Sequence, residues 1–272
     1  MKSIAFLGPK GTFTHEVASS LGENLHPYCS IPTVLKAVEN GECDMGIVPI
    51  ENSIEGPVGI TLDLLVHSKL HIQGEIVLPI NHNLISKKEN EISDIKYVYS
   101  HSQALAQCQN YLEKKRMKPL FTLSTAAAVK LIGDKDDSAA IGTLKSAELY
   151  NLNVLDRDIQ DTMNNETRFI ILSMNKALKS ENSKTSILFE TYKDNPGELY
   201  YILGFFANNN INLTKIESRP SKEGLGKYIF FLDFEGHEDD KTVEKILNKI
   251  NKKTYFMKVL GSYPINIKML ET

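Results

Sequence analysis

The sequence predicts an α/β protein in two parts: a larger N-terminal region built around a largely parallel sheet, and a smaller C-terminal domain. Between residues 3 and 174, short apolar runs alternate with helical patterns, which is typical of strands and helices packed around such a sheet. Residues 175–184 are polar and lack periodicity. We therefore expect a first region at residues 1–175, a linker at 176–184 and a second domain at 185–272.

The elements of the first region follow from its apolar runs and its helical periodicity. Helices are expected at residues 15–21, 61–68 and 103–115, with a short helix capped by Thr33 that ends near Gly41 and another from Ser124 through Ile132. Strands are expected at residues 3–7, 45–50, 97–100, 120–123, 139–142 and 168–174, and residues 75–86 are expected to be extended.

The second domain shows a different order. Strands are expected at residues 185–192, 212–218, 227–235 and 255–262, with helices at 197–208 and 241–251. In the second helix, Val243, Ile246, Leu247 and Ile250 share one face. The order βαββαβ is that of the ferredoxin-like, split βαβ arrangement.

Composition excludes several classes of function. The chain of 272 residues is 42% hydrophobic, and its 31 Lys+Arg against 34 Asp+Glu lack the basic excess of a nucleic-acid-binding protein. No stretch of about 18 apolar residues predicts a membrane span. Cys29, Cys43 and Cys108 have neither zinc-site nor disulfide-framework spacing, so we expect no metal and a reducing, cytoplasmic location.

Two polar motifs follow predicted strands. GPKGTFT (residues 8–14) is a glycine-bearing turn before a helix, where backbone N–H groups can approach an anion; the alternative is an ordinary turn with Thr12 or Thr14 as the helix cap. PIENSIEG (residues 49–56) places Glu51, Asn52 and Ser53 at the carboxyl end of a strand, where open α/β sheets bind ligands; the alternative is a polar loop.

Three further motifs extend this pattern. SHSQALAQC (residues 100–108) offers Ser100 as a cap and Gln103 and Gln107 on one helix face, whereas we interpret His101 as structural. STAAAV (124–129) begins another helix with hydroxyl groups, and together these helix starts predict a cleft for an anion. NNETRF (164–169) adds Arg168 as a cation for a carboxylate and Thr167 as a small donor, although a surface arginine is the alternative.

An ordered set of motifs resembles the prephenate dehydratase family: GPKGTFT, VPIENSIEG, SHSQALAQC, STAAA, AAIGT, IQD and TRF. Two later motifs, NPGEL and ESRP, resemble the regulatory ACT domain of that family. The resemblance covers nearly the whole chain. It implies a catalytic region of two lobes on the plan of type II periplasmic binding proteins, with chain crossings near residues 79–84 and 159–168. It also implies a monofunctional enzyme, since few residues precede Gly8. Ser102 and Glu198 stand where the family usually has proline and alanine.

The resemblance implies a lyase that converts prephenate to phenylpyruvate in L-phenylalanine biosynthesis without a cofactor, because forming an aromatic ring drives the reaction. Thr167 is expected to donate to the departing hydroxyl group, with Asn52, Ser100 and Gln107 orienting the substrate. Phe13 and Phe169 are expected to provide a dry wall. The further residues expected to bind substrate are Lys10, Gly11, Thr12, Glu51, Ser53, Ser124, Thr125, Ala126 and Arg168.

The resemblance also implies regulation. L-phenylalanine is expected to act as an allosteric inhibitor, bound at the ACT domain of a homodimer or homotetramer. Two other functions stay open from the sequence: an arogenate dehydratase, and a non-catalytic amino-acid sensor. The residues expected at the effector site are Asn195, Pro196, Gly197, Glu198, Leu199, Glu217, Ser218, Arg219 and Pro220.

Overall fold

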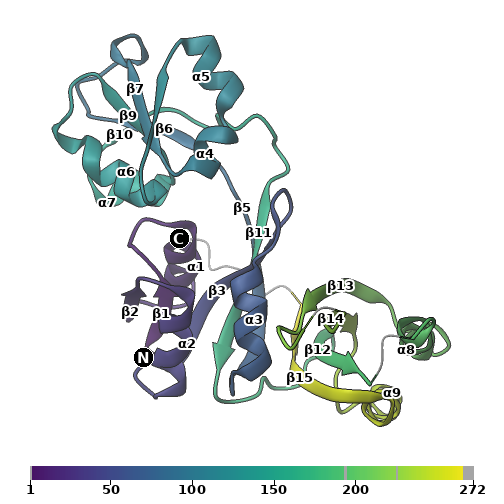
Figure 1. The fold of residues 1–272 in the computed structure, drawn as a ribbon. Coiled ribbons are helices and arrows are strands. Elements are labelled where there is room, and N and C mark those ends of the chain that lie inside the picture. The colour runs from purple at the N-terminus through teal and green to yellow at the C-terminus, as the bar shows by residue number, and fades with distance from the viewer. Residues whose placement is uncertain (1, 193–194, 225, 266–272) are drawn as a thin grey trace.

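The computed structural model describes residues 2–192, 195–224 and 226–265, and it confirms the α/β fold. The N-terminal region consists of two lobes, each built around its own sheet, and the C-terminal domain lies beside the first lobe (Figure 1). Within these ranges, no helix combines the length and apolar character that crossing a membrane requires.

Lobe 1 is built on a sheet of order β2-β1-β3-β11-β5, with β4 paired to β3. β1 pairs with β2 and β3 in parallel, but β11 is antiparallel to both of its neighbours, so the expected largely parallel sheet is mixed in this lobe. Its strands are β1 (Ile4–Leu7), β2 (Leu25–Tyr28), β3 (Met45–Asn52), β4 (Gly56–Pro57), β5 (His71–Pro79) and β11 (Glu166–Ser173), and its helices are α1 (Phe13–Ser19), α2 (Ile31–Glu39) and α3 (Gly59–His67).

Lobe 2 has a sheet of order β10-β6-β9-β7-β8, in which β7 pairs in parallel with β8 and β9 while β6 pairs antiparallel with β9 and β10. Its elements are β6 (Asn83–Ser86), η1 (Ile92–Asp94), β7 (Tyr97–Ser100), α4 (Ser102–Ala106), α5 (Gln109–Lys115), β8 (Lys118–Phe121), α6 (Thr125–Leu131), η2 (Ile132–Asp134), β9 (Ser138–Gly142), α7 (Leu144–Leu149) and β10 (Asn153–Asp156).

Two chain segments connect the lobes. One runs from the end of β5 to β6, and the other returns from β10 to β11. They run together, because the Ile80 N–H donates to the Asn165 carbonyl oxygen at 2.8 Å and the Ile159 N–H donates to that of His82 at 2.9 Å. The extended stretch expected at residues 75–86 is therefore two strands in separate sheets.

The C-terminal domain is an antiparallel sheet of order β13-β14-β12-β15, with both helices packed on one face. This confirms the expected βαββαβ order, although β12 begins at Ser183, inside the expected linker. Val243, Ile246, Leu247 and Ile250 are buried, as their spacing predicts. The elements are β12 (Ser183–Thr191), α8 (Glu198–Ala207), β13 (Leu213–Pro220), β14 (Tyr228–Glu235), α9 (Lys241–Lys253) and β15 (Thr254–Pro264).

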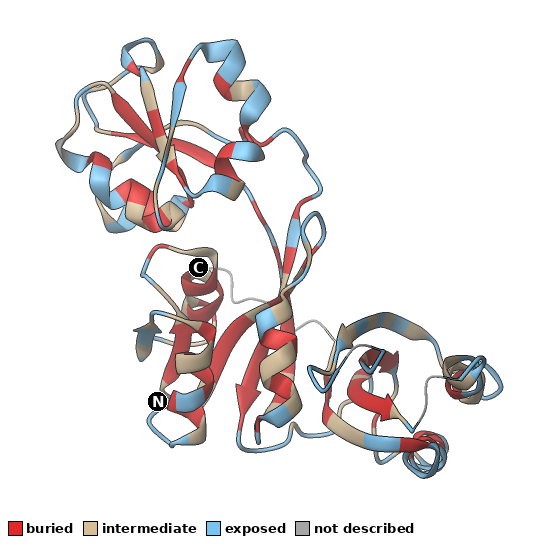
Figure 2. Cartoon of the chain, in the orientation of Figure 1, coloured by how far each residue is buried: buried red, intermediate tan, exposed pale blue. Residues whose placement is uncertain are grey.

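The C-terminal sheet shares a core with lobe 1. Buried residues concentrate on the sheets (Figure 2), and Phe231, Leu260 and Tyr263 belong to the same apolar cluster as the interior of lobe 1. Gly261 lies where β15 approaches β5, and a Cβ there would collide with the Ile72 carbonyl oxygen. The N-terminal region and the C-terminal domain are therefore packed directly together.

Two local predictions are wrong. Ser30, not Thr33, caps α2, because the helix begins three residues earlier and Thr33 Oγ1 accepts from the Ser30 backbone N–H. The single helix expected at residues 103–115 is broken after Ala106. At the break, the Gln107 carbonyl oxygen accepts from the Asp161 N–H of the returning segment at 2.7 Å, which takes it out of the helical pattern.

Candidate active site

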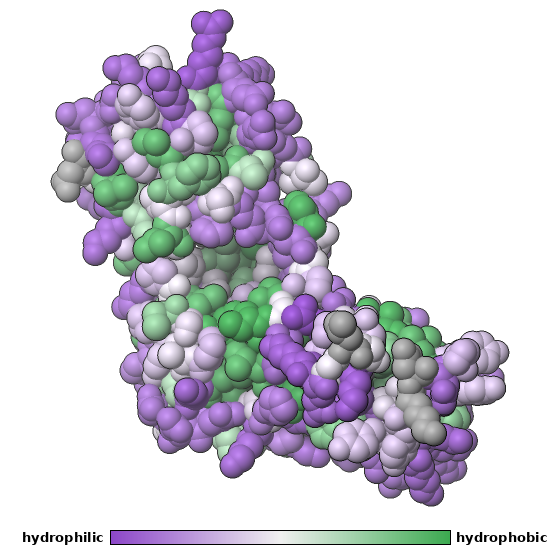
Figure 3. Space-filling view, in the orientation of Figure 1, coloured by the Kyte–Doolittle hydropathy of each residue, from purple (hydrophilic) through white to green (hydrophobic). Residues whose placement is uncertain are grey.

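A cavity of about 250 Å³ opens between the two lobes, where the surface is hollowed in Figure 3. Lobe 1, lobe 2 and both connecting segments contribute to it. Among its described lining residues there is no lysine, arginine, aspartate or glutamate. The lining residues are Thr12, Phe13, Thr14, Pro49, Asn52, Ile80, His82, His101, Gln103, Ala104, Gln107, Leu123, Ser124, Thr125, Asn165, Thr167 and Phe169.

Three helices begin at this cavity. Thr12 caps α1, Ser124 caps α6, and His101 stands at the start of α4; all three residues line the cavity. The first turn of a helix leaves N–H groups without intrahelical partners. An anion in this cavity would therefore meet hydroxyl, amide and N–H donors in place of charged side chains.

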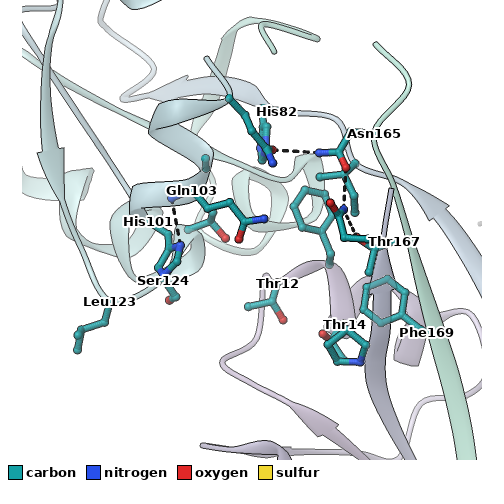
Figure 4. A pocket seen from close by; sticks show the side chains of 17 residues that line it. Thr12, Thr14, His82, His101, Gln103, Leu123, Ser124, Asn165, Thr167 and Phe169 are labelled. Carbon is teal, nitrogen blue, oxygen red and sulfur yellow. Dashed lines mark hydrogen bonds between the residues drawn. The ribbon is translucent and has the colours of Figure 1, made fainter. Parts of the chain in front are cut away.

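A chain of amide hydrogen bonds crosses the back of the cavity, and its direction is fixed at one end. The Asn52 Oδ1 atom accepts from the backbone N–H groups of Ile54 and Glu55 at 3.0 and 2.9 Å, so its Nδ2 atom must face the other way. That Nδ2 lies 2.7 Å from Asn165 Oδ1 and 2.9 Å from Thr167 Oγ1 (Figure 4).

The orientation of Asn52 decides what the Thr167 hydroxyl can do. Because Asn52 Nδ2 is a donor only, Thr167 Oγ1 is the acceptor of that bond. The hydroxyl hydrogen of Thr167 is therefore not used in this bond. Thr167 lines the cavity and is only 9% exposed, so this hydrogen is available to a group bound there.

The same chain continues into lobe 2. Asn165 Oδ1 accepts from Asn52, so Asn165 Nδ2 donates to Gln107 Oε1 at 3.0 Å. Gln107 Oε1 also lies 2.9 Å from the Nε2 atom of His82. Gln107 holds this place because of the helix break, which puts it at the end of α4. The chain thus joins side chains of both lobes.

Apolar rings close the floor of the cavity. Phe169 is 2% exposed, and Phe13 meets the His82 ring edge-on with a centroid distance of 5.9 Å. Burial lowers the pKa of His82, and its hydrogen bond to Gln107 offsets part of that shift. A polar group bound against these rings would be shielded from water on that side.

Eight of the predicted site residues meet at this cavity, and the others do not. Ser100 is fully buried in lobe 2, where its hydroxyl donates to the Ile141 carbonyl oxygen at 2.8 Å. Ser53 is exposed and bonds to the backbone of the returning segment. Lys10 is exposed on the turn before α1. The residues brought together are Thr12, Phe13, Asn52, Gln107, Ser124, Thr125, Thr167 and Phe169.

Gly11 and Ala126 form part of the contact between the lobes and do not line the cavity. The Gly11 carbonyl oxygen accepts from Thr143 Oγ1 of lobe 2 at 2.8 Å. Gly11 has a φ of +91°, and a Cβ there would approach Ser146 to 3.0 Å and Ala126 to 3.5 Å. Glycine is therefore required for both the backbone conformation and the close approach of lobe 2.

Arg168 faces away from the cavity, because successive side chains of a strand point to opposite faces. Its guanidinium lies 2.8 Å from Glu75, 2.6 Å from Asp233 and 3.3 Å from Glu51. Burial disfavours its charge, but the carboxylates of Asp233 and Glu75 outweigh this and raise its pKa. The predicted substrate-binding cation is instead a contact with the C-terminal domain.

Glu51 belongs to the same contact and not to the cavity. Lys215 pairs with Glu51 at 2.8 Å, and Lys184 pairs with Glu75 at 2.6 Å. Three cations thus balance three carboxylates across the junction of lobe 1 and the C-terminal domain. We call these residues the Arg168 cluster: Arg168, Lys184, Lys215, Glu51, Glu75 and Asp233.

Sequence reasoning missed several lining residues. Asn165 lies two positions before Thr167, so strand periodicity could have placed it on the same side. His82 lies in the crossing segment, where no motif marks it. His101, interpreted as structural, both caps α4 and lines the cavity.

The predicted effector residues lie in two separate places. Asn195, Gly197, Glu198 and Leu199 line a groove of about 390 Å³ that tyrosines surround, whereas Pro196 is exposed and does not line it. On β13, Glu217 is half-buried, Ser218 is exposed, and Arg219 and Pro220 line a different groove, next to α3. The Arg219 guanidinium lies 3.2 Å from Asp63 of α3. A single chain does not bring the two motifs together.

The family models match most of the chain. The model described as prephenate dehydratase matches residues 4–177, and the ACT domain model matches residues 185–252. The chain is 45% identical to the prephenate dehydratase of Methanocaldococcus jannaschii, over 97% of this chain and 98% of that protein. It is 37% identical to arogenate dehydratase/prephenate dehydratase 2 of Arabidopsis thaliana, over 98% of this chain and 74% of that protein.

Solved structures share the fold. The prephenate dehydratase of Arthrobacter aurescens in complex with L-Phe has a TM-score of 0.88 and 36% identity, covering 96% of this chain and 90% of that one. GqqA, described as a novel type of quorum quenching acylase, has a TM-score of 0.89 and 26% identity, covering 97% of this chain and 98% of that one. Because that protein is described with another activity, the fold alone does not assign the reaction.

Proposed function

This chain belongs to the prephenate dehydratase family, and we propose that it converts prephenate to phenylpyruvate in the cavity between its lobes, as a carbon–oxygen lyase. The free hydrogen of the Thr167 hydroxyl carries this proposal. The reaction expels carbon dioxide and the ring hydroxyl together, so the departing oxygen needs a donor. Thr167 offers one from within the cavity.

Thr167 acts by an aimed hydrogen bond. A threonine hydroxyl has a high pKa and is a poor general acid. A donor held in place can nevertheless stabilise the negative charge that develops on the departing oxygen, without reorganising during the step. The bond from Asn52 polarises the Thr167 hydroxyl and holds its oxygen in position.

The uncharged lining contributes in a second way. A carboxylate that enters an apolar cavity loses hydration, and the Phe13 and Phe169 rings supply such surroundings beside Thr167. The ring carboxylate disappears as carbon dioxide, so weak solvation of its charge favours the transition state. The side-chain carboxylate can meet the hydroxyl groups and N–H donors at the starts of α1, α4 and α6.

One assay tests the reaction. Purified protein is incubated with prephenate, and phenylpyruvate is measured by its ultraviolet absorbance in alkali. We expect turnover that needs no added metal or cofactor. Absence of phenylpyruvate from a folded protein would refute the proposal and favour a non-catalytic amino-acid sensor.

Arogenate is the alternative substrate, because the Arabidopsis thaliana relative is named for both activities. The two substrates differ in a keto group against an amine. The same assay run with arogenate, with phenylalanine measured as the product, gives the ratio of the two kcat/KM values. We propose prephenate as the better substrate, because no carboxylate among the described lining residues could pair with the ammonium group of arogenate.

We propose L-phenylalanine as the allosteric inhibitor. Support comes from the ACT domain match, from the L-Phe in the Arthrobacter aurescens structure, and from the groove at Asn195, Gly197 and Leu199. β13 lies at one end of the C-terminal sheet, and pairing there with a second copy would form a homodimer, two of which could make up a homotetramer. We expect added L-phenylalanine to lower activity and to tighten this assembly; unchanged activity and unchanged solution scattering would contradict it.

The free thiols of Cys29, Cys43 and Cys108 support a reducing compartment, and we propose the cytoplasm as the location of the enzyme.

A further inference from the structure

His82 is the last member of the hydrogen-bond chain that ends at the cavity. It is 3% exposed and lies on the segment from β5 to β6. Its backbone is held by the returning segment, since its N–H donates to Gln160 Oε1 at 2.8 Å and its carbonyl oxygen accepts from Ile159. The imidazole therefore has a fixed position beside Gln107.

The neighbours of His82 determine which ring nitrogen carries the hydrogen. Gln107 Oε1 already accepts from Asn165 Nδ2 at 3.0 Å. If the Gln107 amide were reversed, its NH₂ group would face the NH₂ group of Asn165. Reversing Asn165 as well would place the Asn165 NH₂ group against that of Asn52. Asn52 cannot be reversed, because its oxygen accepts from two backbone N–H groups. His82 Nε2, 2.9 Å from Gln107 Oε1, must therefore donate.

This arrangement leaves two buried polar atoms with unused capacity. The Nε2 atom of Gln107 and the Nδ1 atom of His82 have no hydrogen-bond partner among the described residues. Both side chains line the cavity. A buried amide without a partner is costly, so a polar group of the substrate that bonds to Gln107 Nε2 would be favoured.

We propose that His82 is a positioning residue for the dehydratase reaction: in its Nε2–H tautomer it holds the Gln107 amide so that the Gln107 NH₂ group is free for a substrate oxygen. The proposal rests on the function proposed above. His82 acts through Gln107 and transfers no proton itself.

Nuclear magnetic resonance tests the tautomer without reference to activity. In protein labelled with ¹⁵N-histidine, His82 is assigned as the signal that disappears in His82→Gln. We expect a protonated Nε2 and an unprotonated Nδ1 at neutral pH. A protonated Nδ1, or rapid exchange between the tautomers, would overturn the proposal whether or not the protein turns over prephenate.

Kinetics test the positioning role. We expect His82→Leu to lower kcat about tenfold to hundredfold, because the Gln107 oxygen loses one of its two donors. His82→Gln, whose amide can donate at the position of Nε2, should restore most of the activity. In a Gln107→Leu background, His82→Leu should cost less than about twofold.

His71→Leu is the matched control, since His71 is a second histidine whose pKa burial lowers and it lies on β5 outside the cavity lining. It should keep the wild-type kcat. Full activity of His82→Leu, failure of His82→Gln to restore activity, or an undiminished effect of His82→Leu without Gln107 would each refute the role. Inactive wild-type protein with the expected tautomer would refute only the proposed function.

Discussion

The two faces of strand β11 meet opposite surroundings. Thr167 and Phe169 face a cavity whose described lining holds no acidic side chain, lysine or arginine. Arg168, between them in sequence, faces the buried charges of the Arg168 cluster. One strand therefore serves two purposes: its cavity face provides weakly solvating surroundings for a reacting anion, and its other face joins lobe 1 to the C-terminal domain.

We therefore expect substitutions on the two faces of β11 to change different properties of the protein. Substitutions on the Arg168 face should destabilise the protein, whereas substitutions on the Thr167 face should slow the reaction.

Arg168→Met should lower the free energy of unfolding by about 3–5 kcal/mol, because it leaves the buried carboxylate of Asp233 without a cation and leaves Glu75 with Lys184 alone. Chemical denaturation followed by circular dichroism measures this. Arg157→Met, at an exposed arginine, is the control and should change the free energy by no more than about 0.5 kcal/mol. A loss of less than 1 kcal/mol for Arg168→Met, as estimated for exposed pairs, would contradict the assignment.

Thr167→Val should lower kcat by about 10²–10³, the cost of removing one aimed donor, while the protein stays folded. Stopped assays of phenylpyruvate measure the rate. Ser173→Ala removes a buried hydroxyl from the other end of β11 and should keep the wild-type kcat. A kcat for Thr167→Val within threefold of wild type would remove Thr167 from the mechanism.

Lys215→Met should lower the free energy of unfolding by about 1 kcal/mol, less than Arg168→Met, because its partner Glu51 is 38% exposed and still has Arg168 nearby. The same denaturation experiment tests it, and high salt should reduce the difference. A loss of unfolding free energy as large as that for Arg168→Met would contradict the prediction that buried ion pairs of the cluster stabilise the protein more than exposed ones.

Acid should weaken the protein through three histidines. Burial is the main cause that lowers the pKa of His15, His71 and His82. Below a pH of about 6.5 these histidines bind protons in the unfolded chain but remain neutral in the folded chain. The free energy of unfolding therefore falls as the pH drops below that value, and the loss is absent above it. Denaturation between pH 7.5 and 5.5 measures this, and the slope should be shallower in His82→Gln. Equal slopes would contradict the assignment of His82.

The sequence allowed the course of the chain to be predicted better than the direction of its side chains. Hydrophobic periodicity placed α9 and the βαββαβ order correctly, because those signals are local. The antiparallel position of β11 depends on β3 and β5, which lie more than 80 residues earlier. No local pattern reports that pairing.

The predicted site shows the same limit. Thr167 and Arg168 are adjacent in one motif, and only the pleat of β11 sends them to opposite faces. Ser100 ends a strand as expected, but its hydroxyl satisfies the Ile141 carbonyl oxygen of a neighbouring strand. Gln107 reaches the cavity because a distant residue, Asp161, interrupts its helix. Each of these outcomes depends on a partner remote in the sequence.

The position of one hydrogen decides whether Thr167 can donate to a bound substrate. A neutron structure of the deuterated protein would locate the deuterium on the Thr167 oxygen. We predict that it points into the cavity while Asn52 donates to that oxygen. A deuterium between the Thr167 and Asn52 side chains, with the Asn52 amide reversed, would contradict the role of Thr167 as a donor.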